Sequence, residues 1–538
     1  MLDISIPYAS LTKFSFKLSA FQLQYRIFKM SLILTIISAA FVAFVLGLLY
    51  LLLGVSVSQK YWEKEKVYTL KNKTPILGHF GPFVLRKKSF PQLIYDLYQD
   101  IKQEGVNFGG MYQFQRRGLV VNNPELISEI TIKQFENFMN RRPFVDQKTD
   151  RLLGRSLLGL QGDEWRDMRH HLSPAFTGSK LRGMLSLIES TCDKFNNFLA
   201  KRAELVDEPL DIYNSFRRLA ADLIATTAFG APSDSISDPE SEFYKNGIKI
   251  MDFSGKRAPI IIGYLLSPPL MKFLGIPFIP QSLTDFFSKK ISDTIRFREE
   301  NNKSRADMIQ LLLDARSDQK KDIPNMDIAS QAFTFFLGGF DTMATAFSFT
   351  THCLALHPDV QVKVREEVRE VMAKHDNRID YEAAKELKYM DMVISEVLRL
   401  HPVAPMSDRI CGSNVSFPEF DLTIEKDTSI AIPIYGLHTD PDYFPEPFKF
   451  DPERFTEENK KNIKPFTYLP FGEGPRNCIG KRFALLELKI GLSKILNEHQ
   501  LEVCEKTNVT NPMVYTTAST LVQPEGGFWL KVKPLNEE

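Results

Sequence analysis

The sequence FGEGPRNCIG at residues 471–480 places Cys478 in a glycine-rich loop, and the helical pattern KRFALLELKIGLSKIL follows it directly. The N–H groups of such a loop and of a helix N-terminus supply positive potential, which favours the thiolate that a metal ligand must be. Glycines also let a flat ligand approach the backbone closely. A buried, inert cysteine is the alternative for a lone Cys, so the choice depends on the remainder of the chain.

Composition and charge limit the class of protein. The chain has 538 residues, 43% of them hydrophobic and 25% charged, as in a globular protein with a large core. Length alone suggests about two to four domains. Because 67 basic residues balance 66 acidic ones, no overall field attracts nucleic acid, and we expect no such partner. The five cysteines are scattered and form no C-x-x-C pair, which argues against a disulfide framework or a zinc site.

The N-terminal region predicts one membrane anchor. Residues 31–53 carry no charge and are long enough to cross ~30 Å of hydrocarbon as a helix. A cleaved signal peptide has a shorter apolar centre of ~7–15 residues, so we expect a retained single-pass anchor. Residues 1–30 form an extension before it. Basic residues flank the anchor almost equally, so the charges do not decide its orientation, but translation from Met30 would remove the upstream ones and leave Lys60 to Lys73 to hold the C-terminal part in the cytosol. Residues 54–82, with their prolines and glycines, are predicted as linker and hinge.

Helical periodicity dominates the remainder of the chain. Strand-like alternation is brief and returns near residues 420–435, so we predict a mainly α fold with a minor β sheet. Residues 259–280 hold five prolines among apolar residues, and we expect them either to be buried or to enter lipid. The helical segments, with apolar residues three and four apart, are residues 180–204, 214–229, 283–317, 325–356, 358–374 and 384–400.

Three pairs of side chains accompany the cysteine loop. Glu396 and Arg399 are three residues apart on one predicted helix face, where an ion pair can form. Trp165 and Arg169 are four apart, so an indole N–H and a guanidinium can address one carboxylate.

The third pair, Asp341 and Thr342, follows two glycines in the long apolar helix. A threonine hydroxyl that bonds back to the preceding turn can loosen a helix and leave room for water. A glycine-weakened core helix with an accidental Asp-Thr pair is the alternative.

Together these motifs resemble the signatures of the cytochromes P450. The resemblance covers residues from about 75 to 533 and is closest to microsomal xenobiotic-metabolising members, including insect ones. It implies the P450 fold, with a single large catalytic domain over residues 83–538 in place of the several domains that length suggests. The family's haem-binding loop F-x-x-G-x-R-x-C-x-G is matched by Phe471, Gly474, Arg476, Cys478 and Gly480.

The resemblance also assigns roles to individual residues. Cys478 is the expected axial ligand of the iron in haem b. Asp341 is expected to relay protons and Thr342 to hold activated oxygen and its water, although Met343 stands where the family usually has another hydroxyl. His438 is expected to be structural and not an axial ligand. Cofactor contacts are expected from Trp165, Arg169, Arg409, Arg476, Phe471 and, last, Arg141.

Two further sets of residues follow from the same resemblance. An ion-pair network that supports the cysteine loop is expected from Glu396, Arg399 and Arg454. A substrate pocket is expected from Phe144, Val145, Phe335, Phe336, Val403, Ala404, Met406, Thr517 and Ala518.

The implied activity is that of a haem-thiolate monooxygenase, which inserts one atom of dioxygen into lipophilic small molecules, xenobiotics among them. The chain has no G-x-G-x-x-G motif after a strand, so electrons from NADPH are expected through NADPH-cytochrome P450 reductase. Lys481, Arg482 and Arg166 are candidate docking residues for it, and cytochrome b5 is a second candidate partner. The expected location is the endoplasmic reticulum membrane, with the catalytic domain in the cytosol.

Alternative activities use the same fold. A peroxide isomerase or dehydratase would need neither a reductase nor a proton relay, and Asp341 with Thr342 argues against it. An endogenous lipid or hormone hydroxylase would use the same site on a different substrate. A membrane-tethered carrier of haem or hydrophobic ligands would keep the fold without oxidation.

Overall fold

The computed structural model describes residues 24–26, 28–39, 41–42, 45, 60–114, 116–143, 145–204, 208–252, 255–318, 324–519 and 522–535. The chain forms two compact units, Met1–Lys66 and Val67–Glu538. The second unit begins before residue 83, because part of the predicted linker belongs to it: the backbone N–H of Leu70 donates to the carbonyl of Gly110 at 3.0 Å.

The first unit carries the predicted anchor. Residues 28–39 are helical where described and expose side chains such as Ile33 and Leu34, and α2 spans Tyr61–Lys64. Among the described residues, no helix combines the length and the apolar character needed to cross a bilayer. Residues 1–23, 27, 40, 43–44 and 46–59, on which much of the extension, anchor and linker fall, lie outside the described residues.

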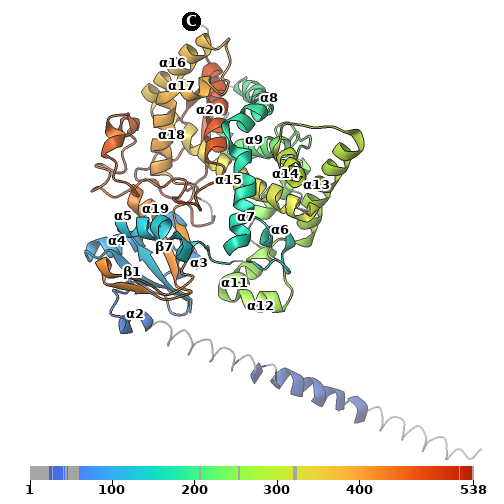
Figure 1. Ribbon diagram of the computed structural model, residues 1–538, viewed down its shortest axis with the longest axis vertical. Helices are drawn as coiled ribbons and strands as arrows, with labels where there is room; N and C mark the ends of the chain where they lie inside the picture. The colour runs from blue at the N-terminus through green and yellow to red at the C-terminus, as the bar shows by residue number, and fades with distance from the viewer. Residues whose placement is uncertain are drawn as a thin grey trace, which may run out of the picture. The chain divides into compact units, whose positions relative to one another are not determined.

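The second unit contains one sheet of four strands, at the lower left of Figure 1 with α4 (Phe90–Gln103) and α19 (Ile434–His438) beside it. Its order is β1-β2-β7-β4, in which only β2 and β7 are parallel. Ile430 of the third strand in this order pairs with Leu119 of the second strand on one side and with Arg409 of the fourth strand on the other. The strands are β1 (Phe108–Gln113), β2 (Arg116–Val121), β7 (Ser429–Ile432) and β4 (Ser407–Ile410).

Two smaller sheets complete the β structure. One orders three strands as β3-β9-β8, and the other is the hairpin β5-β6. Their bounds are β3 (Leu210–Asp211), β9 (Trp529–Pro534), β8 (His499–Glu502), β5 (Val415–Phe417) and β6 (Leu422–Ile424).

Helices form the larger part of the unit, around the long central helix α15 (Asn325–Leu356). Almost every residue of α15 from Ile328 onward is buried, which explains why apolar residues stand on all sides of the helix. Helix α9 (Ile212–Thr227) packs along it most extensively. The other long helices are α7 (Gly162–Leu172), α8 (Gly178–Ala203), α10 (Glu242–Met251), α13 (Gln281–Asn301), α14 (Met308–Asp318), α16 (Pro358–Lys374), α18 (Lys388–Leu400) and α20 (Lys481–Glu498).

The prediction of a mainly α fold with a minor sheet is confirmed. Helices α15 and α16 have the predicted bounds, because Pro358 cannot continue the first and suits the first turn of the second. The single helix predicted for residues 283–317 is wrong. It is divided at Asn302, which adopts the left-handed conformation with φ of 48°, a conformation that Asn tolerates better than most residues.

Residues 259–280 form two short helices, α11 (Ala258–Leu266) and α12 (Pro268–Phe273). They are packed on one side only: Tyr264 and Met271 are buried, whereas Leu270 is 52% and Phe273 85% exposed. Of the two expectations for this segment, complete burial is therefore wrong.

Candidate functional site

The cysteine loop has a backbone shape that depends on its glycines. Gly472 and Gly474 adopt left-handed φ angles of 71° and 73°. A Cβ atom at Gly474 would lie 2.1 Å from the carbonyl oxygen of Thr131, so no other residue fits there. The N–H of Cys478 donates to the carbonyl of Phe471 at 2.9 Å. The loop thereby holds Cys478 just before α20.

The thiol of Cys478 is accessible, yet it is surrounded by protein that affects its ionisation. Burial raises the pKa of Cys478 above its usual value, although the N–H of Gly480 and the cation of Arg169 act in the opposite direction. From the sequence, the loop was predicted to favour the thiolate of Cys478. In the structure, desolvation of the thiol raises its pKa by more than the positive potential of the loop lowers it. A metal cation on the sulfur would reverse this balance, because coordinating thiols are deprotonated.

Four arginines gather beside the loop. Arg169 donates twice to Asn477, at 3.1 Å to its carbonyl and 3.0 Å to its side-chain oxygen. Arg141 donates to the carbonyl of Arg476 at 3.2 Å, and Arg409 to that of Glu473 at 3.1 Å. The cluster therefore draws on β4, α7 and the segment after Phe138.

Arg476 lies at the centre of the cluster. Its guanidinium stacks 3.7 Å from the centre of the Trp165 ring and donates to the carbonyl of Met139 at 2.8 Å. Burial, with Arg141 and Arg409 next in effect, lowers the pKa of Arg476 to about 9. Trp165 thus contacts the arginine cluster with the face of its indole ring.

The cluster fits a ligand with carboxylate groups. Burial, with Arg141 next in effect, lowers the pKa of Arg409 to about 10, while Asp408 is the carboxylate that opposes these effects on both Arg409 and Arg476. The Nε atoms of Arg141 and Arg409 are buried and make no hydrogen bond within the described residues. Two propionates would supply both the missing charge and the missing acceptors. Together with an accessible cysteine in a glycine loop, these residues suit haem.

One face of α15 is open to this region. Phe335, Gly338, Gly339 and Thr342 are spaced as i, i+3, i+4 and i+7 and are partly or fully exposed, in an otherwise buried stretch. A Cβ atom at Gly338 would meet nothing within 4 Å. The hydroxyl of Thr342 donates to the carbonyl of Gly338. The predicted back-bond of Thr342 is therefore present.

Phe176 connects the open face of α15 with the cysteine loop. Its ring packs edge-on against Phe335, with centroids 5.5 Å apart. A Cβ atom at Gly480 would lie 3.9 Å from the same ring and 4.0 Å from the sulfur of Cys478. Phe176 thus lies next to both Phe335 of α15 and the turn that follows Cys478.

Asp341 has a different environment from its neighbour Thr342. It is buried, and Arg217 of α9 donates to its two oxygens at 2.6 and 3.0 Å. Tyr213 donates to it as well, at 3.1 Å. Three donors from α9 therefore hold this carboxylate in place between α9 and α15.

The predicted ion-pair network is present and fully buried at its centre. Arg399 donates to both oxygens of Glu396 at 2.7 and 2.8 Å, and neither side chain is exposed. Arg454 lies 3.5 Å from Glu396 as a second cation. Arg399 also donates to the carbonyl of His438 at 2.8 Å.

His438 connects this network to the cysteine loop. Its Nδ1 lies 3.1 Å from the carbonyl of Arg399, and its Nε2 accepts from the N–H of Leu469 at 2.7 Å. Leu469 in turn accepts the N–H of Gly472, in the loop itself, at 3.0 Å. Both ring nitrogens serve the backbone, so the structural role expected of His438 agrees with its contacts.

The predicted substrate residues differ in their burial. Val145, Phe335, Val403 and Met406 are half-buried at the edge of the core, while Ala404, Thr517 and Ala518 are exposed. Phe336 is fully buried and does not lie on the open face of α15: it packs against Phe229, Phe243, Phe287 and Phe340. Phe144 lies outside the described residues.

Sequence reasoning missed Arg217, Asn477 and Phe176. Arg217 and Phe176 lie more than a hundred residues from the side chains that they contact, so no local spacing relates them. Asn477 stands inside the cysteine motif, at a position that the motif leaves open. Its place next to Cys478 was the only available signal.

Comparison with known proteins gives the family. The cytochrome P450 model matches residues 73–532. Cytochrome P450 9e2 of Blattella germanica is 40% identical over 503 residues, which cover 87% of this chain and 93% of that protein. Cytochrome P450 6k1 of Blattella germanica and probable cytochrome P450 9f2 of Drosophila melanogaster are both 36% identical, over 87% and 86% of this chain and 92% and 93% of theirs. The chain therefore belongs to the cytochrome P450 family and is a haem-thiolate monooxygenase similar to P450s of insects.

Proposed function

We propose that this chain oxidises lipophilic small molecules, xenobiotics among them, at a haem b held by Cys478, with electrons from NADPH passed on by a separate reductase. The observation that carries the proposal is an accessible thiol in a glycine loop next to an arginine cluster in which the buried Nε atoms of Arg141 and Arg409 have no acceptor within the described residues. When bound, a thiolate-ligated haem supplies the oxidising chemistry, because sulfur donates electron density that favours O–O cleavage.

The chain's own residues bind and orient the cofactor. Arg476, Arg409 and Arg141 would bind the propionates, with the planar guanidinium of Arg476 held against Trp165. Arg169 would act through Asn477, which it binds with two hydrogen bonds. Phe471 accepts the N–H of Cys478 and so fixes the direction of the cysteine.

Proton handling is proposed for Thr342. Its hydroxyl donates to Gly338 on the open face, which leaves the oxygen free to accept a hydrogen bond from water. Asp341 would relay protons only after exchanging an Arg217 hydrogen bond for water, because three donors already occupy it. Thr342, on the open face of α15, would therefore meet the proton path first, with the buried Asp341 behind it.

The substrate pocket is proposed on the open face of α15. Phe335 contributes an aromatic edge there, and Val145, Val403 and Met406 are half-buried apolar side chains at the border of the core. Apolar walls with few polar groups select for lipophilic ligands and exclude water.

Electron delivery is proposed at the N-terminus of α20. Lys481 and Arg482 are exposed there, three and four residues after Cys478, and form no ion pair within the described residues. Arg166 is already paired with Glu136 and with Asp163, so we assign it a smaller share. NADPH-cytochrome P450 reductase is the proposed donor, and cytochrome b5 a second partner.

Attachment to the endoplasmic reticulum membrane is proposed through residues 31–53. The apolar and uncharged sequence of that segment supports the proposal. The exposed apolar side chains of α12 supply a second contact with lipid.

Turnover assays test the proposed function. The full chain with reductase, NADPH and dioxygen is offered a panel of lipophilic compounds, and a parallel set receives a lipid hydroperoxide alone. Oxygenated products with matching NADPH consumption are expected in the first set. Turnover of the hydroperoxide alone would instead favour a peroxide isomerase, and a spectral response to ligands without any product would favour a carrier.

A further inference from the structure

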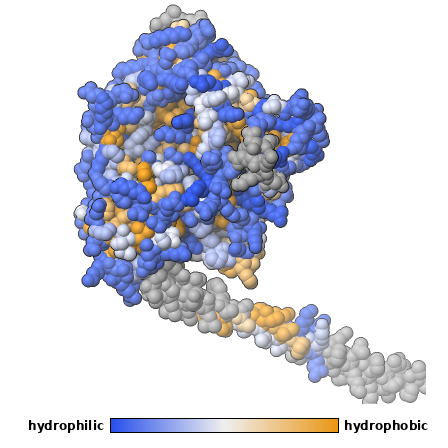
Figure 2. All heavy atoms as spheres, in the orientation of Figure 1, coloured by the Kyte–Doolittle hydropathy of each residue, from blue (hydrophilic) through white to orange (hydrophobic). Residues whose placement is uncertain are grey.

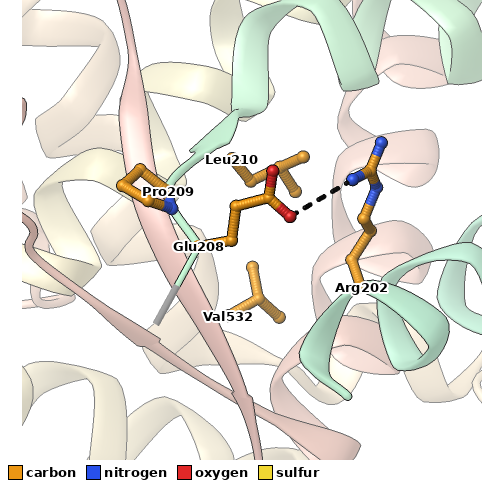
Figure 3. Close-up of a pocket in the computed structure, with 5 residues that line it drawn as sticks. All are labelled: Arg202, Glu208, Pro209, Leu210 and Val532. Carbon is orange, nitrogen blue, oxygen red and sulfur yellow. Dashed lines mark ion pairs between the residues drawn. The ribbon is translucent and has the colours of Figure 1, made fainter. Parts of the chain in front are cut away.

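A cavity of about 320 Å³ lies between the start of α6 (Arg151–Gly154) and the start of α13, away from the residues of the haem site. Its volume is at the low end of the ~300–1,000 Å³ typical of ligand pockets. The residues that line it include Lys148, Asp150, Arg151, Pro277, Gln281 and Thr284. A second pocket, drawn in Figure 3 around the ion pair of Arg202 and Glu208, has only about 10 Å³, too little for a ligand.

The cavity carries cations without partners. The side chains of Lys148 and Arg151 are exposed and form no ion pair or hydrogen bond with the described residues. Asp150 is the carboxylate in the wall, but its two oxygens accept the N–H groups of Leu153 at 2.9 Å and Ile279 at 2.7 Å. Both carboxylate oxygens of Asp150 are thus already occupied by backbone donors.

The cavity also contains unused hydrogen-bond donors. Helix α13 starts at Gln281 without a side-chain cap, and the N–H groups of Gln281 and Ser282 make no hydrogen bond within the described residues, whereas that of Leu283 donates to the carbonyl of Pro280 at 2.9 Å. The hydroxyl of Thr284 makes no hydrogen bond within the described residues, whereas those of Thr334 and Thr350 donate to the carbonyl four residues before them. Thr284 is 93% buried and lines the cavity, so its hydroxyl is available to a ligand inside it.

An exposed apolar surface adjoins the cavity. Leu270, Phe273 and Leu274 on and just after α12 are 52%, 85% and 54% exposed. Lys272, between them, is paired at 2.7 Å with Asp146, two residues before Lys148. Figure 2 shows a hydrophobic tip at the lower edge of the catalytic unit, where Figure 1 draws α11 and α12.

We propose that this cavity binds the phosphate-bearing headgroup of an anionic phospholipid, whose acyl chains lie on the apolar surface of α12. Lys148 and Arg151 supply the charge, and Thr284 with the first N–H groups of α13 supplies oriented donors. A choline headgroup carries its own cation and is therefore a poorer match. The proposal rests on the proposed membrane attachment and not on the proposed oxidation.

Amide hydrogen exchange tests the proposal on the full, haem-loaded chain. The protein is placed in vesicles of phosphatidylcholine alone or with phosphatidylserine, and exchange is followed at Gln281, Ser282 and residues 148–150. We expect phosphatidylserine to slow exchange at these amides about tenfold. A third sample, phosphatidylcholine vesicles with soluble glycerol phosphate, separates the lipid from a free phosphate.

Variants test whether the protection by phosphatidylserine depends on the residues of this cavity. The double variant Lys148→Gln/Arg151→Gln should lose the protection by phosphatidylserine, and Thr284→Val, which keeps the size of the side chain, should reduce it. Lys460→Gln/Lys461→Gln changes the net charge equally at two exposed lysines of η7 (Asn459–Asn462) and should keep it.

Three results would overturn the proposal: equal protection in phosphatidylcholine alone, equal loss in both double variants, or full protection by glycerol phosphate with no addition from phosphatidylserine. NADPH-dependent turnover in the same samples reports on the oxidation independently. Failure of turnover with intact lipid protection would therefore count against the proposed function and not against this site.

Discussion

The guanidinium of Arg399 donates hydrogen bonds to both carboxylate oxygens of Glu396, at 2.7 and 2.8 Å, and neither side chain is exposed to solvent. The same arginine donates to the carbonyls of His438 and Pro447. This pair is thus tied to the segments that lead into the cysteine loop. Its removal should affect the haem site although neither residue belongs to it.

Replacing Glu396 by Ala should abolish haem loading. The change leaves Arg399 as an uncompensated buried cation, at a cost of ~3–5 kcal/mol in the free energy of unfolding. Haem content per folded chain and urea unfolding measure the effect. Glu370→Ala, at an exposed position of α16, is the control and should be neutral. Normal haem content in Glu396→Ala would refute the supporting role of the network.

Replacing His438 by Leu should weaken the cysteine loop. Leu469 would lose the acceptor of its buried N–H, at a cost of ~1–3 kcal/mol. The expected results are lower stability and faster loss of haem, measured by unfolding and by transfer of haem to an acceptor protein. A variant as stable as the parent would show that the bond to Leu469 contributes nothing.

Mild acid should destabilise the catalytic unit. Burial lowers the pKa of His438 and of His401 to about 3, and that of His352 to about 4. Below the usual histidine pKa of about 6.5 the unfolded chain binds more protons than the folded one, so stability falls as pH decreases through this window. Each histidine contributes up to ~1.4 kcal/mol per pH unit. Urea midpoints that stay constant from pH 7 to 5 would contradict this.

Replacing Glu487 by Gln should stabilise the protein near neutral pH. Burial raises the pKa of Glu487 in α20 to about 8, and one of its oxygens has no hydrogen-bond partner in the described residues. The folded chain retains a proton that the unfolded chain releases above about pH 4.5, so stability contributed by the wild-type acid falls as pH rises from 4.5 to 8. Because the histidines contribute equally to both proteins, the stability gained by the variant over the parent in urea unfolding should grow as pH rises from 4.5 to 8, and a constant difference would contradict this.

Replacing Arg476 by Lys should accelerate loss of haem. An ammonium group cannot stack on Trp165 as the planar guanidinium does at 3.7 Å, nor bind a carboxylate with two parallel hydrogen bonds. We expect haem to dissociate about tenfold faster or more, an effect comparable to one lost charge-assisted hydrogen bond. Arg482→Lys, at an exposed position of α20, should leave the rate unchanged.

The bounds of helices could be predicted from the sequence where an apolar period meets a proline. The bounds of α15 and α16 follow from an apolar pattern that meets Pro358. The break at Asn302 left only a weak signal, because asparagine is favoured at helix C-termini but is also found inside helices.

The site was predicted residue by residue only where motifs are contiguous. The spacing of Glu396 and Arg399 on one helix correctly predicted their contact. The different environments of Phe335 and Phe336 could not be predicted in this way, because the two are neighbours in sequence and only Phe336 is fully buried. The partner of Asp341 comes from another helix, α9. Desolvation of Cys478 depends on everything packed around the loop, so the loop sequence alone gave the wrong balance for its thiol.

The carbon monoxide spectrum of the reduced, folded protein tests the central claim most directly. If the sulfur of Cys478 is the axial ligand, the parent should give a Soret band near ~450 nm, as thiolate ligation does in this family. Cys478→Ser should lose that band while remaining folded. A parent without the band, or a serine variant that keeps it, would contradict the account.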